Sequence, residues 1–361
     1  MEWKVVKQGA VERRRRWNEV TVHLSALLAL FAIYCAIPIP GAEAASCTTQ
    51  SQMTAAQRDA LTQSSRAIAT QIQSGDVQAL QANTIPAVAA NFGGIAALVQ
   101  DQKQLIEKAV LTIDNLYVLD ASSNPPGAQR TDFYCGHPLV SMNFTNLPPG
   151  TYALAIVHAT GIPHAQQITL ILSKENTGGW MLGGVVARPM IELGHDGLWY
   201  WTSARNYAAT KMNWDAWLYY RVAAHLLDPI DLLSSPNLEK LQQETEKVRP
   251  AGLSGPGPMS LPAHGTTYSL SAMDTTTTFG ALDLDVHYIP DTAEAAQLHD
   301  PPSARKQVLD IMSALLEQHP ELQQAFHGIW VHADKGANSL FALELPMSAI
   351  VQEGAAHPAT R

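Results

Sequence analysis

The sequence predicts an α+β protein with a central helical hairpin between two β-rich regions. Apolar residues recur at helical spacing over residues 53–106, and the period changes to two after Ala109, as in half-buried strands. The segment from Gly197 to Pro229 then holds four tryptophans and four tyrosines. We therefore expect helices plus a curled antiparallel sheet, the hairpin, and a C-terminal ββαββ two-layer domain.

The first 44 residues have the pattern of an export signal. A basic run, Arg13–Arg16, precedes an apolar stretch, and Ala42-Glu43-Ala44 is a small-residue cleavage site. The apolar stretch is interrupted by prolines and is short for a membrane span, which needs about 20 residues. We predict a signal peptide over residues 1–44 and a periplasmic or extracellular protein, with an uncleaved N-terminal anchor as the alternative.

The charge balance argues against nucleic acid as a partner. Removing the six basic and four acidic residues of segment 1–44 leaves 17 Lys/Arg against 28 Asp/Glu, a net charge of −11. An acidic chain without a basic stripe binds nucleic acid and anionic membranes poorly. We expect membrane attachment only through an uncleaved signal or a lipidated Cys47.

Two cysteines remain beyond the signal, Cys47 and Cys135. In an oxidising compartment, two cysteines favour one disulfide that closes a long loop. A lipoprotein cysteine at Cys47 is the alternative, although the residues before it lack the upstream leucine of a typical lipobox.

The region of residues 45–190 reads as helices followed by an antiparallel sheet. We predict strands over residues 110–120, 140–145, 152–159, 166–172 and 180–187, separated by Pro- and Gly-rich turns. Gly183-Gly184 inside the last strand predicts a bulge that curls the sheet. Helices before a curled sheet that ends in Trp-Met-Leu-Gly-Gly resemble the NTF2-like class, which implies an apolar pocket and an Asp114/His158 pair as the catalytic candidate.

The aromatic segment reads as two helices stopped at Asp228-Pro229, with Asp196 capping the first and Asn213 the second. Small residues at Ala204, Ala216 and Ala223 share faces with tyrosines, a spacing that resembles one tetratricopeptide helical hairpin. No second copy follows at a period near 34 residues. The resemblance implies binding of a protein or peptide, and the alternative is an ordinary helical hairpin packed on a sheet. We predict that the binding residues are Tyr200, Trp201, Tyr207, Trp217 and Tyr220.

The remaining boundaries follow from composition. Residues 191–248 hold the hairpin and a covering helix, and residues 249–265, rich in Pro and Gly, predict a linker. Residues 266–352 predict the ββαββ domain, and residues 353–361 a polar tail.

One polar cluster suggests metal chemistry. Asp283, Asp285 and His287 alternate with apolar residues and so share one face of a strand, while His332 and Asp334 share a face of another. If those strands are neighbours, their side chains can converge on zinc or manganese. Alternation alone also produces the polar, solvated face of any one-sided sheet. We favour that second explanation and assign no metal, no cofactor and no catalytic residue.

The function predicted from the sequence is non-enzymatic binding of a protein, a peptide or a small apolar ligand. The chain has no nucleophile elbow, P-loop, dinucleotide-binding glycine motif or zinc-protease motif. The alternative is an exported enzyme, either a pocket enzyme using Asp114 and His158 or a metal-assisted hydrolase using Asp283, Asp285, His287 and His332.

Overall fold

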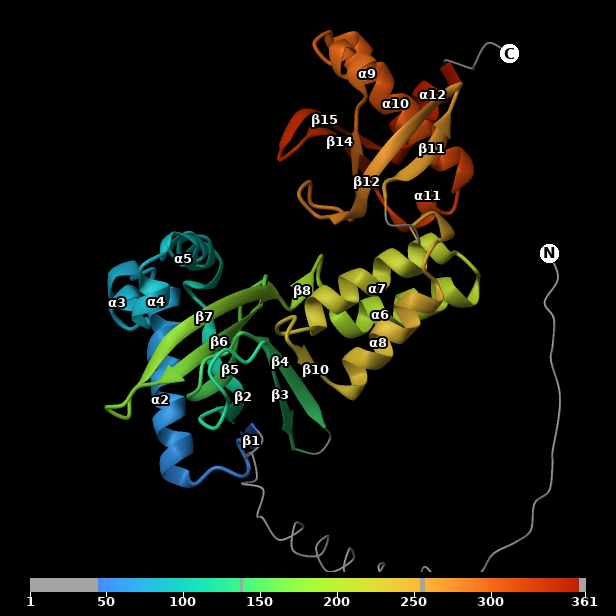
Figure 1. Cartoon of the computed structure of the whole chain (residues 1–361). Helices are drawn as coiled ribbons and strands as arrows, with labels where there is room; N and C mark the ends of the chain where they lie inside the picture. The colour runs from blue at the N-terminus through green and yellow to red at the C-terminus, as the bar shows by residue number, and fades with distance from the viewer. Residues whose placement is uncertain (1–44, 137–138, 254–256, 357–361) are drawn as a thin grey trace, which may run out of the picture. The chain divides into compact units, whose positions relative to one another are not determined.

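The computed structural model shows an α+β fold and describes residues 45–136, 139–253 and 257–356 (Figure 1). The predicted signal segment 1–44 and the end of the predicted tail lie outside the described residues. None of the described helices combines the length and the apolar composition that a membrane span requires.

After the short strand β1 (Ser46–Thr49), four helices follow: α2 (Ala55–Ser74), α3 (Val77–Ala82), α4 (Pro86–Ala89) and α5 (Gly93–Ile106). Thr54 starts α2 with a capping box, because its hydroxyl accepts from the Gln57 amide while the Gln57 side chain accepts from the Thr54 amide. Gly75 ends α2 in the left-handed conformation, at φ 73°.

The main antiparallel sheet has the order β1-β2-β5-β6-β7. Its strands are β1 (Ser46–Thr49), β2 (Val110–Asp120), β5 (Thr151–Thr160), β6 (Gln166–Lys174) and β7 (Trp180–Pro189). The predicted bulge is confirmed, since Ile171 pairs with Gly184 and Leu172 with Leu182, leaving Gly183 unpaired. Helices α2 and α5 pack on one face of this sheet (Figure 1).

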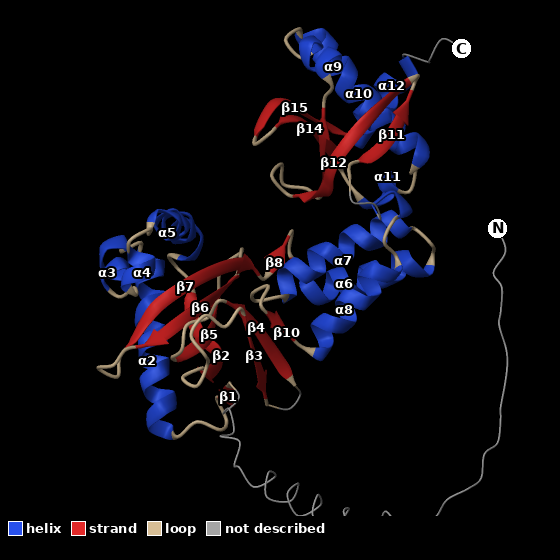
Figure 2. Cartoon of the chain, in the orientation of Figure 1, coloured by secondary structure: helices blue, strands red, loops and turns tan. Residues whose placement is uncertain are grey.

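A smaller sheet covers the other face, with β4 (Val140–Thr145) between β3 (Arg130–Cys135) and β10 (Leu233–Ser234) (Figure 2). Strand β5 is consequently buried on both faces. Cys47 and Cys135, the cysteines for which we predicted a disulfide, are joined in the structure and tie β1 to β3.

The short strands β8 (Ile191–Glu192) and β9 (His195–Asp196) lead into the helical hairpin. The hairpin consists of α6 (Gly197–Ala209) and α7 (Asn213–Leu227), and α8 (Pro236–Lys247) lies beside it (Figure 2). Ala204, Ala216 and Ala223 are fully buried, as their small size suggested. Asp196 caps α6 as predicted, but the cap of α7 is Met212, and Asn213 is its first helical residue.

The C-terminal region has more elements than the predicted ββαββ pattern. Its sheet has the order β11-β12-β13-β14-β15, with β11 (Met259–Ala263), β12 (Thr266–Thr276), β13 (Asp283–Ile289), β14 (Gly328–Lys335) and β15 (Asn338–Pro346). The helical elements are η1 (Ala251–Leu253), α9 (Thr292–Gln297), α10 (Pro301–Gln318), α11 (Leu322–Ala325) and α12 (Met347–Ala356). Strand β11 thus lies inside the segment that we predicted to be a linker.

Strands β13 and β14 are parallel neighbours, whereas the other pairings in this sheet are antiparallel. The chain between them crosses over through α9, α10 and α11, the long connection that a parallel pair needs. Apolar residues of both strands, including Leu284, Val286 and Val331, are fully buried in one core with α10. Alternation directs Asp283, Asp285 and His287 to the opposite face.

Candidate metal centre

The polar face of the C-terminal sheet brings together two histidines and an aspartate from neighbouring strands. In the parallel register of β13 and β14, His287 pairs with His332 and Asp285 with Trp330. The two imidazole rings stack with centroids 4.5 Å apart and an interplanar angle of 10°. The spacing of adjacent strands, about 4.8 Å, accounts for this arrangement because the rings lie side by side on one face.

The donor atoms of this triad converge. Oδ1 of Asp285 lies 3.3 Å from Nε2 of His287 and 3.2 Å from Nε2 of His332. Ligands bound to Zn²⁺ at about 2.0–2.2 Å in tetrahedral or octahedral geometry lie about 2.8–3.6 Å from one another. The two distances measured here fall in that range.

Two of the three atoms have no hydrogen-bond partner although both are buried, namely Oδ1 of Asp285 and Nε2 of His332. These two atoms lie 3.2 Å apart, but their geometry is not that of a hydrogen bond. Lone pairs that converge in this way suit a shared cation, whereas an unpaired buried polar atom costs about 1–3 kcal/mol.

Further contacts hold the imidazoles in place. Nδ1 of His287 lies 2.6 Å from Oδ2 of Asp334, so the carboxylate fixes the ring orientation and leaves Nε2 free to bind. The indole of Trp330 packs against His332, with ring centroids 4.1 Å apart. Burial lowers the pKa of His332, chiefly by desolvation, and this favours the neutral form that binds metals.

The four residues that we proposed for a metal-assisted hydrolase do not form one group. Asp285, His287 and His332 come together, but Asp283 belongs to a separate cluster with His327 and Glu344. Asp334 lies two residues beyond His332 on the same face of β14, and it contacts His287 from there. Sequence reasoning missed Glu344 and Trp330, since only the pairing of β14 with its neighbours brings them to this face.

The predicted aromatic binding residues are part of the hydrophobic core of the folded chain. Tyr200, Trp201, Trp217 and Tyr220 are between 1% and 8% exposed, and the partly buried Tyr207 packs against the same core. Residues buried to this extent stabilise the hairpin and present no surface to a partner in this conformation.

Glu244 of α8 accepts hydrogen bonds from two of these aromatic residues, Trp201 and Tyr220, and from Arg205. Its Oε2 accepts from the Trp201 indole at 2.7 Å, the Arg205 guanidinium at 2.7 Å and the Tyr220 hydroxyl at 3.3 Å. The hydrogen bonds from Arg205 lower the pKa of Glu244 more than burial raises it. Helix α8 therefore covers the hairpin through a charged hydrogen-bond network.

The alternative catalytic pair, Asp114 and His158, is close but exposed. Oδ2 of Asp114 lies 3.9 Å from Nε2 of His158, which itself lies 3.1 Å from Oε1 of Gln167. The Asp114 side chain is 44% exposed. Solvent therefore screens its charge, and the pair lacks the enclosed setting that tunes a general base.

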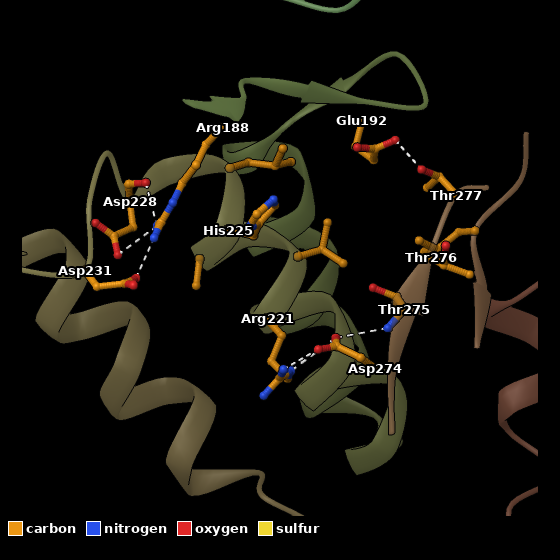
Figure 3. Close-up of a pocket in the computed structure, with 14 residues that line it drawn as sticks. Arg188, Glu192, Arg221, His225, Asp228, Asp231, Asp274, Thr275, Thr276 and Thr277 are labelled. Carbon is orange, nitrogen blue, oxygen red and sulfur yellow. Dashed lines mark hydrogen bonds and ion pairs between the residues drawn. The ribbon is translucent and has the colours of Figure 1, made fainter. Parts of the chain in front are cut away.

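A pocket of about 570 Å³ lies where α7 meets β12, and titratable groups line it (Figure 3). Arg188 binds the carboxylates of Asp228 and Asp231, and Arg221 binds Asp274. His225 faces the same space, and desolvation, aided by the charge of Arg188, lowers its pKa. Both arginines are already paired with carboxylates, so the pocket offers no unpaired guanidinium to an anionic ligand.

This pocket borders the sheet face that carries Asp285, His287 and His332. Asp274 on β12 pairs directly with Asp285 on β13, so their side chains point to the same side of the sheet, about 5 Å apart at Cβ.

Comparison with protein-family models, with curated proteins and with solved structures finds no match for this chain. The functional argument therefore depends on the geometry of the described residues.

Proposed function

We propose that this chain is an exported metal-binding protein that holds a divalent transition metal ion between Asp285, His287 and His332. The convergence of three donor atoms carries the proposal, because two of them are buried without hydrogen-bond partners while lying 3.2 Å apart. A polar, solvated sheet face would direct such groups to water instead.

The donor set favours Zn²⁺. Two imidazoles and one carboxylate are common zinc ligands, and three protein ligands leave a fourth position open. The same set also serves Fe²⁺. A redox-inert ion suits an oxidising compartment, for which the signal-like N-terminus and the Cys47–Cys135 disulfide provide support.

A calorimetric titration of tag-free, metal-stripped protein with Zn²⁺ tests the proposal. We expect His332→Ala to remove one binding event and Asp334→Asn to weaken it about 10–100-fold, because Asp334 only orients His287. His299→Ala is the matched control, since His299 is an exposed histidine away from the cluster. Equal zinc binding by wild type and by folded His332→Ala protein would contradict the proposal.

A metal-assisted hydrolase is the second candidate function. Three protein donors would leave a coordination position for water, whose pKa zinc would lower to about 7, and the adjacent polar pocket would give a substrate room beside it. Asp274 and His225 line that pocket. Zinc-loaded protein should then hydrolyse an activated ester or phosphodiester at a rate that His332→Ala abolishes. Zinc binding without such hydrolysis would leave a storage, transport or structural role.

A further inference from the structure

A second cluster of metal-ligand type lies at the start of β13, where Asp283, His327 and Glu344 bring one donor atom each to within 4.8 Å of one another. Nδ1 of His327 lies 3.2 Å from Oδ1 of Asp283. Trp330 separates this group from the first, since it pairs with Asp285 on one side and with Glu344 on the other.

The burial of Asp283 is the first observation that points to a ligand. Its side chain is 0% exposed, and its Oδ2 has no hydrogen-bond partner. An ionised carboxylate in such a place is costly unless it is paired or coordinates a metal. His327 satisfies one carboxylate oxygen only.

Gly328 is the second observation. A Cβ atom at this position would lie 2.6 Å from Oε1 of Glu344, 2.7 Å from the backbone carbonyl oxygen of Leu345 and 3.0 Å from Oδ1 of Asp283. The two carboxylates thus meet in a space that only glycine leaves open. The donor oxygens of the two carboxylates lie within 4.8 Å of each other, where like charges repel, and a bound cation would neutralise them.

We infer that Asp283, His327 and Glu344 form a second divalent metal site, independent of the one at His332. Two carboxylates and one imidazole make a harder donor set than that of the first site, which favours Mn²⁺. The sheet would then carry two ions on one face with Trp330 between them.

Native mass spectrometry and Mn²⁺ electron paramagnetic resonance on tag-free, metal-stripped protein test this inference. Wild type should bind two ions, and His327→Ala and Asp283→Asn should each bind one. His327 is the better first target, because its side chain is 58% exposed and its removal leaves the core intact.

The variants distinguish the loss of one metal site from the loss of the other. A wild type that binds a single ion, lost in His332→Ala and retained in His327→Ala, would overturn this inference and leave the proposed function standing. An ion lost in His327→Ala and retained in His332→Ala would support the second site and contradict the first. Unchanged Mn²⁺ binding in both His327→Ala and Asp283→Asn would also overturn the inference.

Discussion

Asp215 should make the stability of this protein fall as the pH rises. It lies in the first turn of α7 with 0% exposure, and neither carboxylate oxygen has a hydrogen-bond partner. Burial, and to a smaller extent the charge of Glu321, raises the pKa of Asp215 from 3.8 to about 7. Between these values the folded protein keeps a proton that the unfolded chain has released, so the folded state loses relative stability until the pH passes about 7.

The magnitude follows from about 1.36 kcal/mol for each pH unit. From pH 5 to pH 8 this group should remove about 2–3 kcal/mol from the free energy of unfolding, the proton being lost near pH 7. The positive end of α7 favours the anion by about 0.3–1 kcal/mol, which places the expected loss near 2 kcal/mol.

Urea denaturation of wild type and Asp215→Asn at pH 5 and pH 8 measures this effect. The variant cannot titrate, so its free energy of unfolding should fall by about 2 kcal/mol less than that of wild type over this interval. Asp101→Asn, which changes an exposed aspartate on α5, is the control and should follow the wild-type profile. Parallel pH profiles for wild type and Asp215→Asn, at equal urea m-values, would refute the reasoning.

Three further predictions concern the disulfide, the hairpin and the metal centre. Replacing Cys47 and Cys135 by serine should lower the free energy of unfolding by about 4–5 kcal/mol, by the loop-entropy estimate for a separation of 88 residues. A loss below about 1 kcal/mol in denaturant titrations would contradict this prediction. Gly197→Ala should lower the free energy of unfolding by about 1–3 kcal/mol, because the new Cβ would lie 2.5 Å from Cγ of Leu227. Thermal denaturation of this variant beside Gly94→Ala, which has open space around it, checks the prediction, because Gly94→Ala should not lower the midpoint and an equal effect of the two changes would contradict it. Zinc affinity should weaken as the pH falls, because protons compete with the metal for the imidazoles. The loss should reach up to about tenfold per pH unit for each proton displaced. Calorimetric zinc binding that does not change with pH would contradict this prediction.

Local patterns predicted most strands and helices because their signals are short-range. The period-two alternation defined β2 and β4 at their observed ends. Strand β11 was missed because Pro and Gly in its surroundings predict a linker. Pro262 lies in this strand at the edge of the sheet, where the missing N–H costs no ladder hydrogen bond.

The candidate site was predictable only in part. Alternation alone placed Asp283, Asp285 and His287 on one face, but the position of His332 beside His287 depends on a parallel crossover that joins distant segments. The aromatic hairpin shows the opposite problem. Its composition identified a packing centre, yet composition does not distinguish buried rings such as Tyr200 from rings on a binding surface.

Anomalous diffraction at the zinc absorption edge, from crystals of tag-free protein grown with Zn²⁺, is the most direct test of the metal centre. We predict an anomalous peak about 2.0–2.2 Å from Oδ1 of Asp285 and from Nε2 of His287 and His332. A map with no anomalous peak between these three atoms, from crystals in which zinc is bound elsewhere, would contradict the assignment.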